Sequence, residues 1–312
     1  MPQVGAVVTA WFSPGECTTA IAVALLMNQL GGVTMYFSPL VVRAPVEGVL
    51  QEDVQREDIR GDITILMYIH FGMSFVLFLC VLFYFPDGPP SPPSPSSQEE
   101  REDFVTSLKD FLRNPNLILL VVAYGVSFGV VGNWLGFMTY SLLEIGIHQE
   151  ETMGVAISAT LSASVAAFVA ARLTDKMYGF LKVTILGLLA TSFAFFLWFF
   201  YLSTGVIAPT LTQAYISVTV GVACQFASVP LLLQLCLELA FPISEGVVGA
   251  VVTTCFAFVS LVFLLLFLIP DVGYVWVSYV ILFSVSLSLI PVLFVKEEHK
   301  RTQADQEGKM KK

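Results

Sequence analysis

The sequence predicts an all-α protein that crosses a membrane several times. Three observations carry this prediction: the chain is 56% hydrophobic and only 12% charged, long runs lack Asp, Glu, Lys and Arg altogether, and the basic residues are unevenly distributed between these runs. Soluble domains carry about 25% charged residues. With roughly half that share and a mean hydropathy of +0.80, this chain is expected to expose much of its surface to lipid.

The charge-free runs set the number of helices. A helix needs about 20 predominantly apolar residues to span a bilayer. The run 183–237 is too long for one span and divides near Ser203–Pro209, where glycine and proline interrupt a helix. Only helices and closed barrels satisfy every backbone group in hydrocarbon, and strict alternation is lacking here. The sequence therefore predicts about eight transmembrane helices, in the runs 19–42, 63–86, 116–143, 152–171, 183–237 (two helices), 246–270 and 272–295.

The lysines and arginines predict the orientation, because cytoplasmic loops carry an excess of both. With both termini in the cytoplasm, the cytoplasmic segments hold 12 of the 15 basic residues. The predicted organisation is a cytoplasmic segment 1–18, two helices in 19–86, a Pro-rich linker with an amphipathic helix in 87–115, six helices in 116–295, and a cytoplasmic tail 296–312. The amphipathic helix places Phe104, Leu108, Phe111 and Leu112 on one face. A lead-in turn of the third span is the alternative.

Other functional classes find little support. The acidic residues cluster in loops and in the tail, as solvated segments do, and no basic stripe indicates nucleic acid. The five cysteines lack metal-ligand spacing and read as small apolar side chains. We predict no enzyme activity, no catalytic residues, no metal site and no cofactor. The expected partners are the lipid bilayer and a small-molecule solute.

The order of the predicted spans and the sequence of one loop both resemble those of a transporter superfamily. Two spans, a long cytoplasmic linker and six more spans fit the plan of the major facilitator superfamily, which is built from two six-helix halves, if four helices are missing in front. The loop Arg172–Lys182 is similar to the cytoplasmic signature of that superfamily, with Asp175, Lys176, Gly179 and Lys182 in the roles of acid, base, glycine and base. The resemblance implies a gating loop that helps to set the open and closed states.

Further motifs resemble the solute carrier 49 family, and within it the disrupted-in-renal-carcinoma-2 branch, which is related to the feline leukaemia virus subgroup C receptors. They are Trp11–Glu16 with Asn28–Gly32 and Pro39–Val42, Leu112–Asn114 with Ala123–Gly125 and Asn133–Trp134, and a cytoplasmic loop motif carried by Glu238, Pro242 and Glu245. The resemblance covers nearly the whole chain. It implies a major facilitator fold that is N-terminally truncated and lacks helices one to four.

The family resemblance also implies a function. We expect a secondary transporter of a small organic solute that works by alternating access, with a pyridoxine-like (vitamin B6) substrate and possible proton coupling. A lysosomal membrane is the expected location, with the plasma membrane as the alternative. A choline or haem transporter of the sister branch, and a truncated isoform that transports nothing alone, remain the alternatives.

Candidate cavity residues follow from the cost of polar groups in hydrocarbon. His70 is the one ionisable side chain within the charge-free runs that we nominate for proton coupling, against a neutral histidine bonded to a neighbouring helix. Interhelical hydrogen bonding is the alternative for Asn28 and Gln29, and a lipid-facing anchor is the alternative for Trp134. The candidates for the substrate cavity are Asn28, Gln29, Tyr124, Asn133, Trp134, Gln213 and Gln225.

Overall fold

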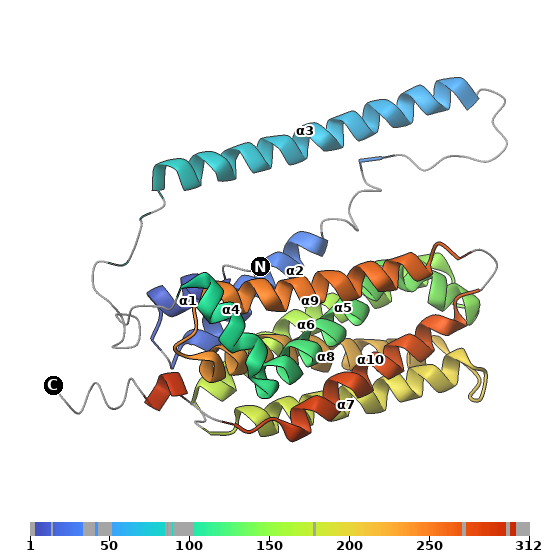
Figure 1. Ribbon diagram of the computed structural model, residues 1–312. Helices are drawn as coiled ribbons and strands as arrows, with labels where there is room; N and C mark the ends of the chain where they lie inside the picture. Colours follow the sequence, from blue (N-terminus) through green and yellow to red (C-terminus); the bar gives the residue numbers. More distant parts are fainter. Residues whose placement is uncertain are drawn as a thin grey trace. The chain divides into compact units, whose positions relative to one another are not determined.

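The computed structural model describes residues 4–13, 15–33, 41–42, 52–84, 86, 89, 103–176, 179–269, 273–297 and 300–303. The elements named among them are all α-helices, as predicted (Figure 1). Their bounds are α1 Val4–Trp11, α2 Cys17–Val33, α3 Glu52–Tyr84, α4 Phe104–Arg113, α5 Pro115–Glu144, α6 Gln149–Lys176, α7 Leu181–Ser203, α8 Leu211–Ala240, α9 Glu245–Leu266 and α10 Val275–Phe294.

Seven of the described helices are long and apolar enough to cross a membrane, namely α3 and α5 to α10. The expected division of the run 183–237 is observed, because α7 ends at Ser203 and α8 begins at Leu211. The eighth expected span, 19–42, is described only as far as Val33, where α2 ends, together with residues 41–42. The polytopic all-α class is confirmed.

The chain divides into two compact units. Unit 1 combines residues 1–27 with 90–312, and unit 2 comprises residues 28–89. The main element of unit 2 is the 33-residue helix α3, whose apolar side chains from Ile63 to Tyr84 are nearly all exposed.

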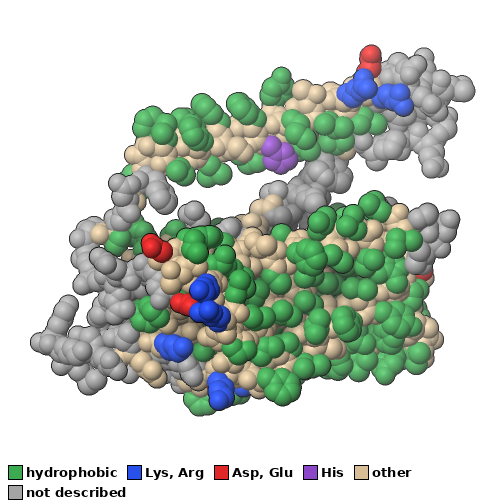
Figure 2. Space-filling view, in the orientation of Figure 1, with side chains coloured by type: hydrophobic (Ala, Val, Ile, Leu, Met, Phe, Trp, Pro, Cys, Tyr) green, Lys and Arg blue, Asp and Glu red, His purple; other side chains and the backbone are tan. Residues whose placement is uncertain are grey.

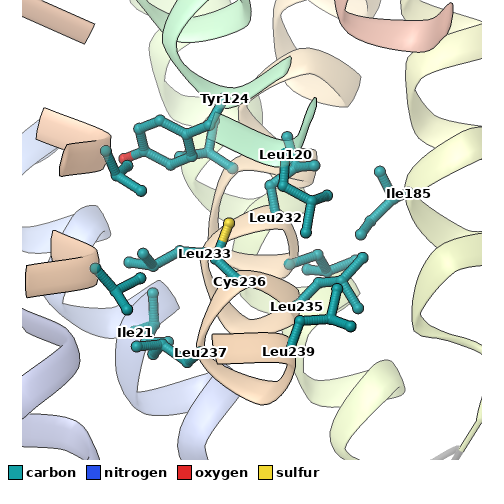
Figure 3. Packing of buried hydrophobic residues seen from close by; sticks show 14 of the residues in the cluster. Ile21, Leu120, Tyr124, Ile185, Leu232, Leu233, Leu235, Cys236, Leu237 and Leu239 are labelled. Atoms are coloured by element: carbon teal, nitrogen blue, oxygen red, sulfur yellow. The ribbon is translucent and has the colours of Figure 1, made fainter. Parts of the chain in front are cut away.

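Unit 1 is a bundle of six long helices in which α8 is central. Helix α8 packs against α6, α7 and α5, while α5 also packs against α9 and α10, and α10 against α7. Every residue of α8 from Gln225 to Ala240 is buried. Figure 3 shows Leu232, Leu235 and Leu239 of this helix among side chains of α5 and α7, with Ile21 of α2 on the same core.

Local sequence signals explain where the helices of unit 1 begin and end. Asn114 accepts a hydrogen bond from the amide of Asn116, and Pro115 occupies the first helical position of α5, where no donor is lost. This cap makes α4 a helix of its own rather than a lead-in turn of α5. Thr210 caps α8 in the same way by accepting from the amide of Gln213 at 3.3 Å.

Two glycines let α5 and α9 approach closely. A Cβ atom at Gly125 would lie 2.6 Å from Cys255 Sγ, and one at Gly129 would lie 2.8 Å from Val259 Cγ1. Distances below about 3 Å are not tolerated between such atoms, so only glycine fits at either position. Small residues at helix contacts are the usual means of close packing in membranes, where no hydrophobic force draws helices together.

The surface of unit 1 separates apolar from basic side chains. Large apolar residues such as Phe258, Leu261, Phe283 and Leu293 are exposed, as expected for contact with lipid. Figure 2 shows hydrophobic side chains over much of the visible surface. The basic residues gather at one end, near α4, the α6–α7 turn and the end of α10 (Figure 2). We call this the basic end, and its residues are Lys109, Arg113, Arg172, Lys176, Lys182, Lys296, Lys300 and Arg301.

Candidate functional site

The signature loop 172–182 contacts α2 at the basic end through Asp175. The amides of Thr18 and Thr19 donate to Oδ1 and Oδ2 of Asp175 at 3.2 and 2.7 Å. These amides lie in the first turn of α2, where backbone N–H groups have no partner within the helix and the helix dipole favours an anion. Asp175 therefore links two segments separated by more than 150 residues in the chain.

The glycine and the second base of the loop have separate roles. Gly179 has φ of +83°, a left-handed conformation that other residues rarely adopt, so the turn into α7 depends on glycine here. Lys182 Nζ donates to the carbonyl oxygens of Leu293 and Val295 at 3.0 and 2.6 Å. These carbonyls lie at the C-terminal end of α10, where a cation is favourable. Lys176 is exposed at the end of α6.

The predicted loop motif between α8 and α9 also lies at the basic end. Glu238 is 3% exposed near the end of α8, and its carboxylate accepts hydrogen bonds from Gln234 and Thr302. Pro242 is exposed and follows a cis peptide bond, and Glu245 is the first residue of α9. The structure thus brings Glu238 together with a segment that follows α10.

In the bundle interior, Gln225 forms a polar layer with two serines. Its Nε2 donates to Ser127 Oγ of α5, and its Oε1 accepts from Ser192 Oγ of α7 at 2.8 Å. Ser192 Oγ also lies 2.9 Å from the carbonyl oxygen of Gly221. All three side chains are buried. The amide of Gln225 therefore forms interhelical hydrogen bonds that join α5, α7 and α8. Its assignment to a substrate cavity stays a prediction.

Four aromatic side chains lie together near this layer. The ring of Phe128 is 5.2 Å from that of Phe226, 5.0 Å from that of Phe256 and 6.2 Å from that of Tyr124. Phe128 and Phe256 are half-buried, whereas Tyr124 and Phe226 are buried. We call Tyr124, Phe128, Phe226 and Phe256 the aromatic cluster. It draws on α5, α8 and α9, and two of its four rings are half-buried.

Asn133 and Trp134 of α5 point to different partners. Asn133 Nδ2 donates to the carbonyl oxygen of Gly129 and to Ser260 Oγ of α9, at 2.6 and 2.8 Å. Trp134 is fully buried against Phe196 and Phe199 of α7. A lipid-facing anchor was the alternative for this tryptophan, and that alternative is wrong because the indole has no exposed surface.

The remaining candidates are Gln213 in unit 1 and Asn28, Gln29 and His70 in unit 2. Gln213 is in the first turn of α8, and its buried Oε1 has no hydrogen-bond partner in the described part of the chain. Asn28 is exposed in α2, and the side chain of Gln29 lies outside the described residues. His70 is exposed on α3 in unit 2. Their assignment to a cavity stays a prediction.

Several residues of these contacts were not predicted from the sequence. Ser127 and Ser192 were missed because a serine in an apolar helix most often bonds its own backbone, and nothing in the pattern singles out these two. Thr18 and Thr19 contribute main-chain amides, which leave no side-chain signal. Among the described residues, no group of three or more His, Cys, Asp or Glu side chains is placed to hold a metal ion.

Comparison with known proteins identifies what the chain resembles. The family model described as Major Facilitator Superfamily matches residues 1–264. A solute carrier family 49 member 4 homolog of Xenopus laevis is 32% identical over 307 residues, which cover 95% of this chain and 66% of that protein. The choline/ethanolamine transporter flvcr2a of Danio rerio is 23% identical over 257 residues, covering 77% of this chain and 50% of that protein.

The fold resembles a solved transporter structure. The crystal structure of the fucose:proton symporter FucP of E. coli superposes with a TM-score of 0.63 at 12% sequence identity. The superposition covers 95% of this chain and 72% of the symporter. At this identity the likeness concerns the fold alone.

Proposed function

Because the chain belongs to the major facilitator superfamily, we propose that it forms part of a secondary transporter that moves a small organic solute by alternating access. The superfamily and the solute carrier 49 resemblance predicted from the motifs are confirmed by the matches. The chain spans about two thirds of the length of its solute carrier 49 relative, so the activity of the complete protein is part of this proposal.

The contact between Asp175 and α2 supports alternating access most directly. It joins the last turn of α6 to a helix that precedes the Pro-rich linker, and in the proposed 6 + 6 plan these belong to opposite halves. A carboxylate that caps a helix start contributes about 1 kcal/mol, enough to favour a closed end without making it permanent. In this proposal the contact breaks when the basic end opens.

The aromatic cluster favours a flat or cationic solute. Phe128 and Phe256 offer half-buried ring faces, on which an aromatic ring or an organic cation can stack. No lysine or arginine lies in the runs 116–143, 152–171, 183–237, 246–270 and 272–295. A multivalent anion therefore has little to bind there. A pyridoxine-like solute fits this chemistry and is the proposed substrate.

Choline or ethanolamine is the second candidate. Two observations favour it: the chain is similar to Danio rerio proteins named as choline/ethanolamine transporters, and ring faces attract quaternary ammonium groups. The same cluster would bind either solute, so a transport measurement has to separate them.

We further propose that the basic end faces the cytoplasm, whether the protein lies in the plasma membrane or in the lysosomal membrane. The positive-inside tendency supports this orientation, since every described lysine and arginine of unit 1 lies at that end. The lysosomal location rests on the family resemblance alone. His70, exposed on α3, is the proposed proton-coupling group.

Uptake of radiolabelled pyridoxine tests the proposal. Cells would express either this 312-residue chain or a version extended with the N-terminal residues of the Xenopus relative, both confirmed at the plasma membrane. We expect saturable uptake by the extended form that is faster at acidic outside pH, and loss of that pH dependence in His70→Gln. Competition with choline separates the two substrates. Absence of uptake of both solutes by both surface-expressed forms would overturn the proposed substrates.

A matched pair of variants tests the role of Asp175. Asp175→Ala removes the contact with α2, and we expect it to lower the maximal uptake rate. Asp110→Ala removes a carboxylate at the same end that is 44% exposed and, among the described residues, pairs with Arg113 of its own helix at 3.9 Å. Uptake by this control should match the parent. Equal rates for both variants would contradict a gating role for Asp175.

A further inference from the structure

A single helical turn after α10 carries a buried arginine into the basic end. Residues 300–303 are helical and follow the end of α10, near the C-terminal label in Figure 1. We call them the tail turn. Arg301 in this turn is 1% exposed, which makes it one of the largest fully buried side chains of the chain. Lys296, only a few residues earlier, is exposed.

The guanidinium of Arg301 reaches the segment that precedes the Pro-rich linker. Its Nη2 donates to the carbonyl oxygen of Thr9 in α1 at 3.3 Å, and its Nη1 lies 3.5 Å from Cys17 Sγ at the start of α2. Thr9 and Cys17 are themselves buried. The tail turn therefore contacts residues nearly 300 positions away in the chain.

The next residue attaches the same turn to α8. The amide of Thr302 donates to Oε2 of Glu238 at 3.2 Å, and its hydroxyl donates to Oε1 at 3.0 Å. Glu238 is buried at the end of the central helix of the bundle, where Gln234 Nε2 also donates to it at 3.3 Å. Two consecutive residues of the tail turn thus contact two different segments.

Burial of these groups makes the contact strong while the turn is in place. A buried guanidinium or carboxylate is costly unless it is hydrogen-bonded and paired, so each depends on the partners brought by the other segments. Opening of the basic end would separate α1 and α2 from α8. Arg301 and Glu238 would then have to reach water, which requires the tail turn to leave.

We propose that the tail turn is a clasp that holds the basic end closed. Arg301 binds Thr9 of α1 and Cys17 of α2, and Thr302 binds Glu238 of α8. Withdrawal of the turn releases the α1–α2 segment from the bundle. The meaning of this clasp for transport rests on the proposed alternating access. The clasp itself can be tested without transport, so failure of one does not imply failure of the other.

Cys17 is a built-in reporter of the closed state. It precedes the apolar run 19–42 that predicts a span, and it has no exposed surface. Burial raises the pKa of its thiol to about 11, while the positive charge of Arg301 opposes this rise. Loss of the Arg301 charge alone would therefore raise the pKa further and slow reaction of the thiol with a maleimide. Faster reaction can result only from exposure.

The experiment measures the rate of maleimide labelling at Cys17 in membranes, resolved by peptide mass spectrometry. Arg301→Ala should label Cys17 about ten-fold faster than the parent, because a charge-assisted hydrogen-bonding group that closes the site is lost. Lys296→Ala is the matched control, since it removes an exposed positive charge from the same segment and should leave the rate unchanged. Cys236, which is fully buried in α8, reports on loss of the fold and should stay unlabelled.

Thr302→Val is the second variant and keeps Arg301 in place. It removes the hydroxyl that donates to Glu238, so we expect a smaller increase at Cys17 with Cys236 still protected. If Arg301→Ala unfolds and exposes both cysteines, Thr302→Val becomes the test of the clasp. An unchanged or slower rate at Cys17 in Arg301→Ala with an intact fold would overturn the clasp, and so would an unchanged rate in Thr302→Val.

Discussion

The interior polar layer and the basic end use hydrogen bonds for opposite purposes. In the interior, Gln225, Ser127 and Ser192 join α5, α7 and α8, which all belong to the six-helix bundle. At the basic end, Asp175 joins the bundle to α2, and Arg301 joins the tail turn to α1. Both α1 and α2 precede the Pro-rich linker in the sequence, whereas the bundle and the tail turn follow it. The interior bonds therefore hold one body together, whereas the end bonds join parts that the proposed cycle has to separate.

This difference predicts how substitutions divide between stability and opening. A change in the interior should lower the stability of the bundle and leave the basic end closed. A change in a contact between segments should open the basic end and leave the bundle stable.

The largest effect is expected at the seam between α5 and α9. In Gly125→Ala the new Cβ would lie 2.6 Å from Cys255 Sγ and 3.2 Å from the carbonyl carbon of Cys255. Overpacking of this kind costs about 1–3 kcal/mol. We expect a lower unfolding temperature of the purified protein, with part of the loss recovered in Gly125→Ala/Cys255→Ala because the clash with sulfur is removed.

Gly187→Ala is the matched control for this seam. Gly187 lies inside α7, and a Cβ atom there would meet no heavy atom within 4 Å. Because alanine favours a helix over glycine by about 0.8–1.0 kcal/mol, this variant should be as stable as the parent or more stable. Similar destabilisation by both substitutions would contradict a close α5–α9 contact.

The next effect is expected in the polar layer itself. Gln225→Leu removes the amide that bonds Ser127 and Ser192, and we expect a loss of about 1 kcal/mol, since hydrogen bonds between membrane helices contribute modestly. Thermal unfolding measures this loss, and Cys17 should remain protected from maleimide. Gln213→Leu is the control, because the buried Oε1 of Gln213 has no partner among the described residues and its removal should cost nothing. A labelled Cys17 in Gln225→Leu would break the proposed division.

These two glutamines show what the sequence could and could not predict. Hydropathy predicts the helices well, because a bilayer demands long apolar runs with every backbone group bonded inside the helix. It treats Gln213 and Gln225 alike, although Gln213 has a side-chain oxygen without a partner among the described residues and Gln225 joins three helices. Which side chains form hydrogen bonds between helices depends on how each helix is rotated about its own axis. The position of a charge-free run in the sequence does not specify this rotation.

The basic end shows the same limit for charged residues. The clustering of lysines and arginines predicts one end of the bundle, and the motif resemblance predicts Asp175 and Lys182 within it. Nothing in the tail distinguishes Arg301 from Lys296 or Lys300, because all three fit a solvated basic segment. The burial of Arg301 arises from contacts with Thr9 and Cys17, which come from the other end of the chain.

A smaller effect, on opening rather than stability, is expected from Asp175→Ala. Loss of a capping carboxylate weakens a helix start by about 1 kcal/mol, which corresponds to roughly five-fold in an equilibrium. Hydrogen exchange at the amides of Thr18 and Thr19 should therefore become about five-fold faster. Exchange in the buried part of α8 should not change. Slow exchange at both threonines in this variant would show that Asp175 does not hold α2.

The smallest effect is expected from Lys182→Met. This variant tests whether loss of any polar contact at the basic end opens it, or only loss of a contact between segments. Lys182 Nζ donates to the carbonyls of Leu293 and Val295, so its contact stays within the six-helix bundle and the segment directly after α10. A cation at a helix C-terminus contributes about 0.3–1 kcal/mol, and the methionine stem preserves the packing. We expect a slight fall in unfolding temperature with unchanged exchange at Thr18 and Thr19. If Lys182→Met instead speeds exchange at these threonines as much as Asp175→Ala does, then any loss of polar contact at this end opens it, and the separate role assigned to contacts between segments is wrong.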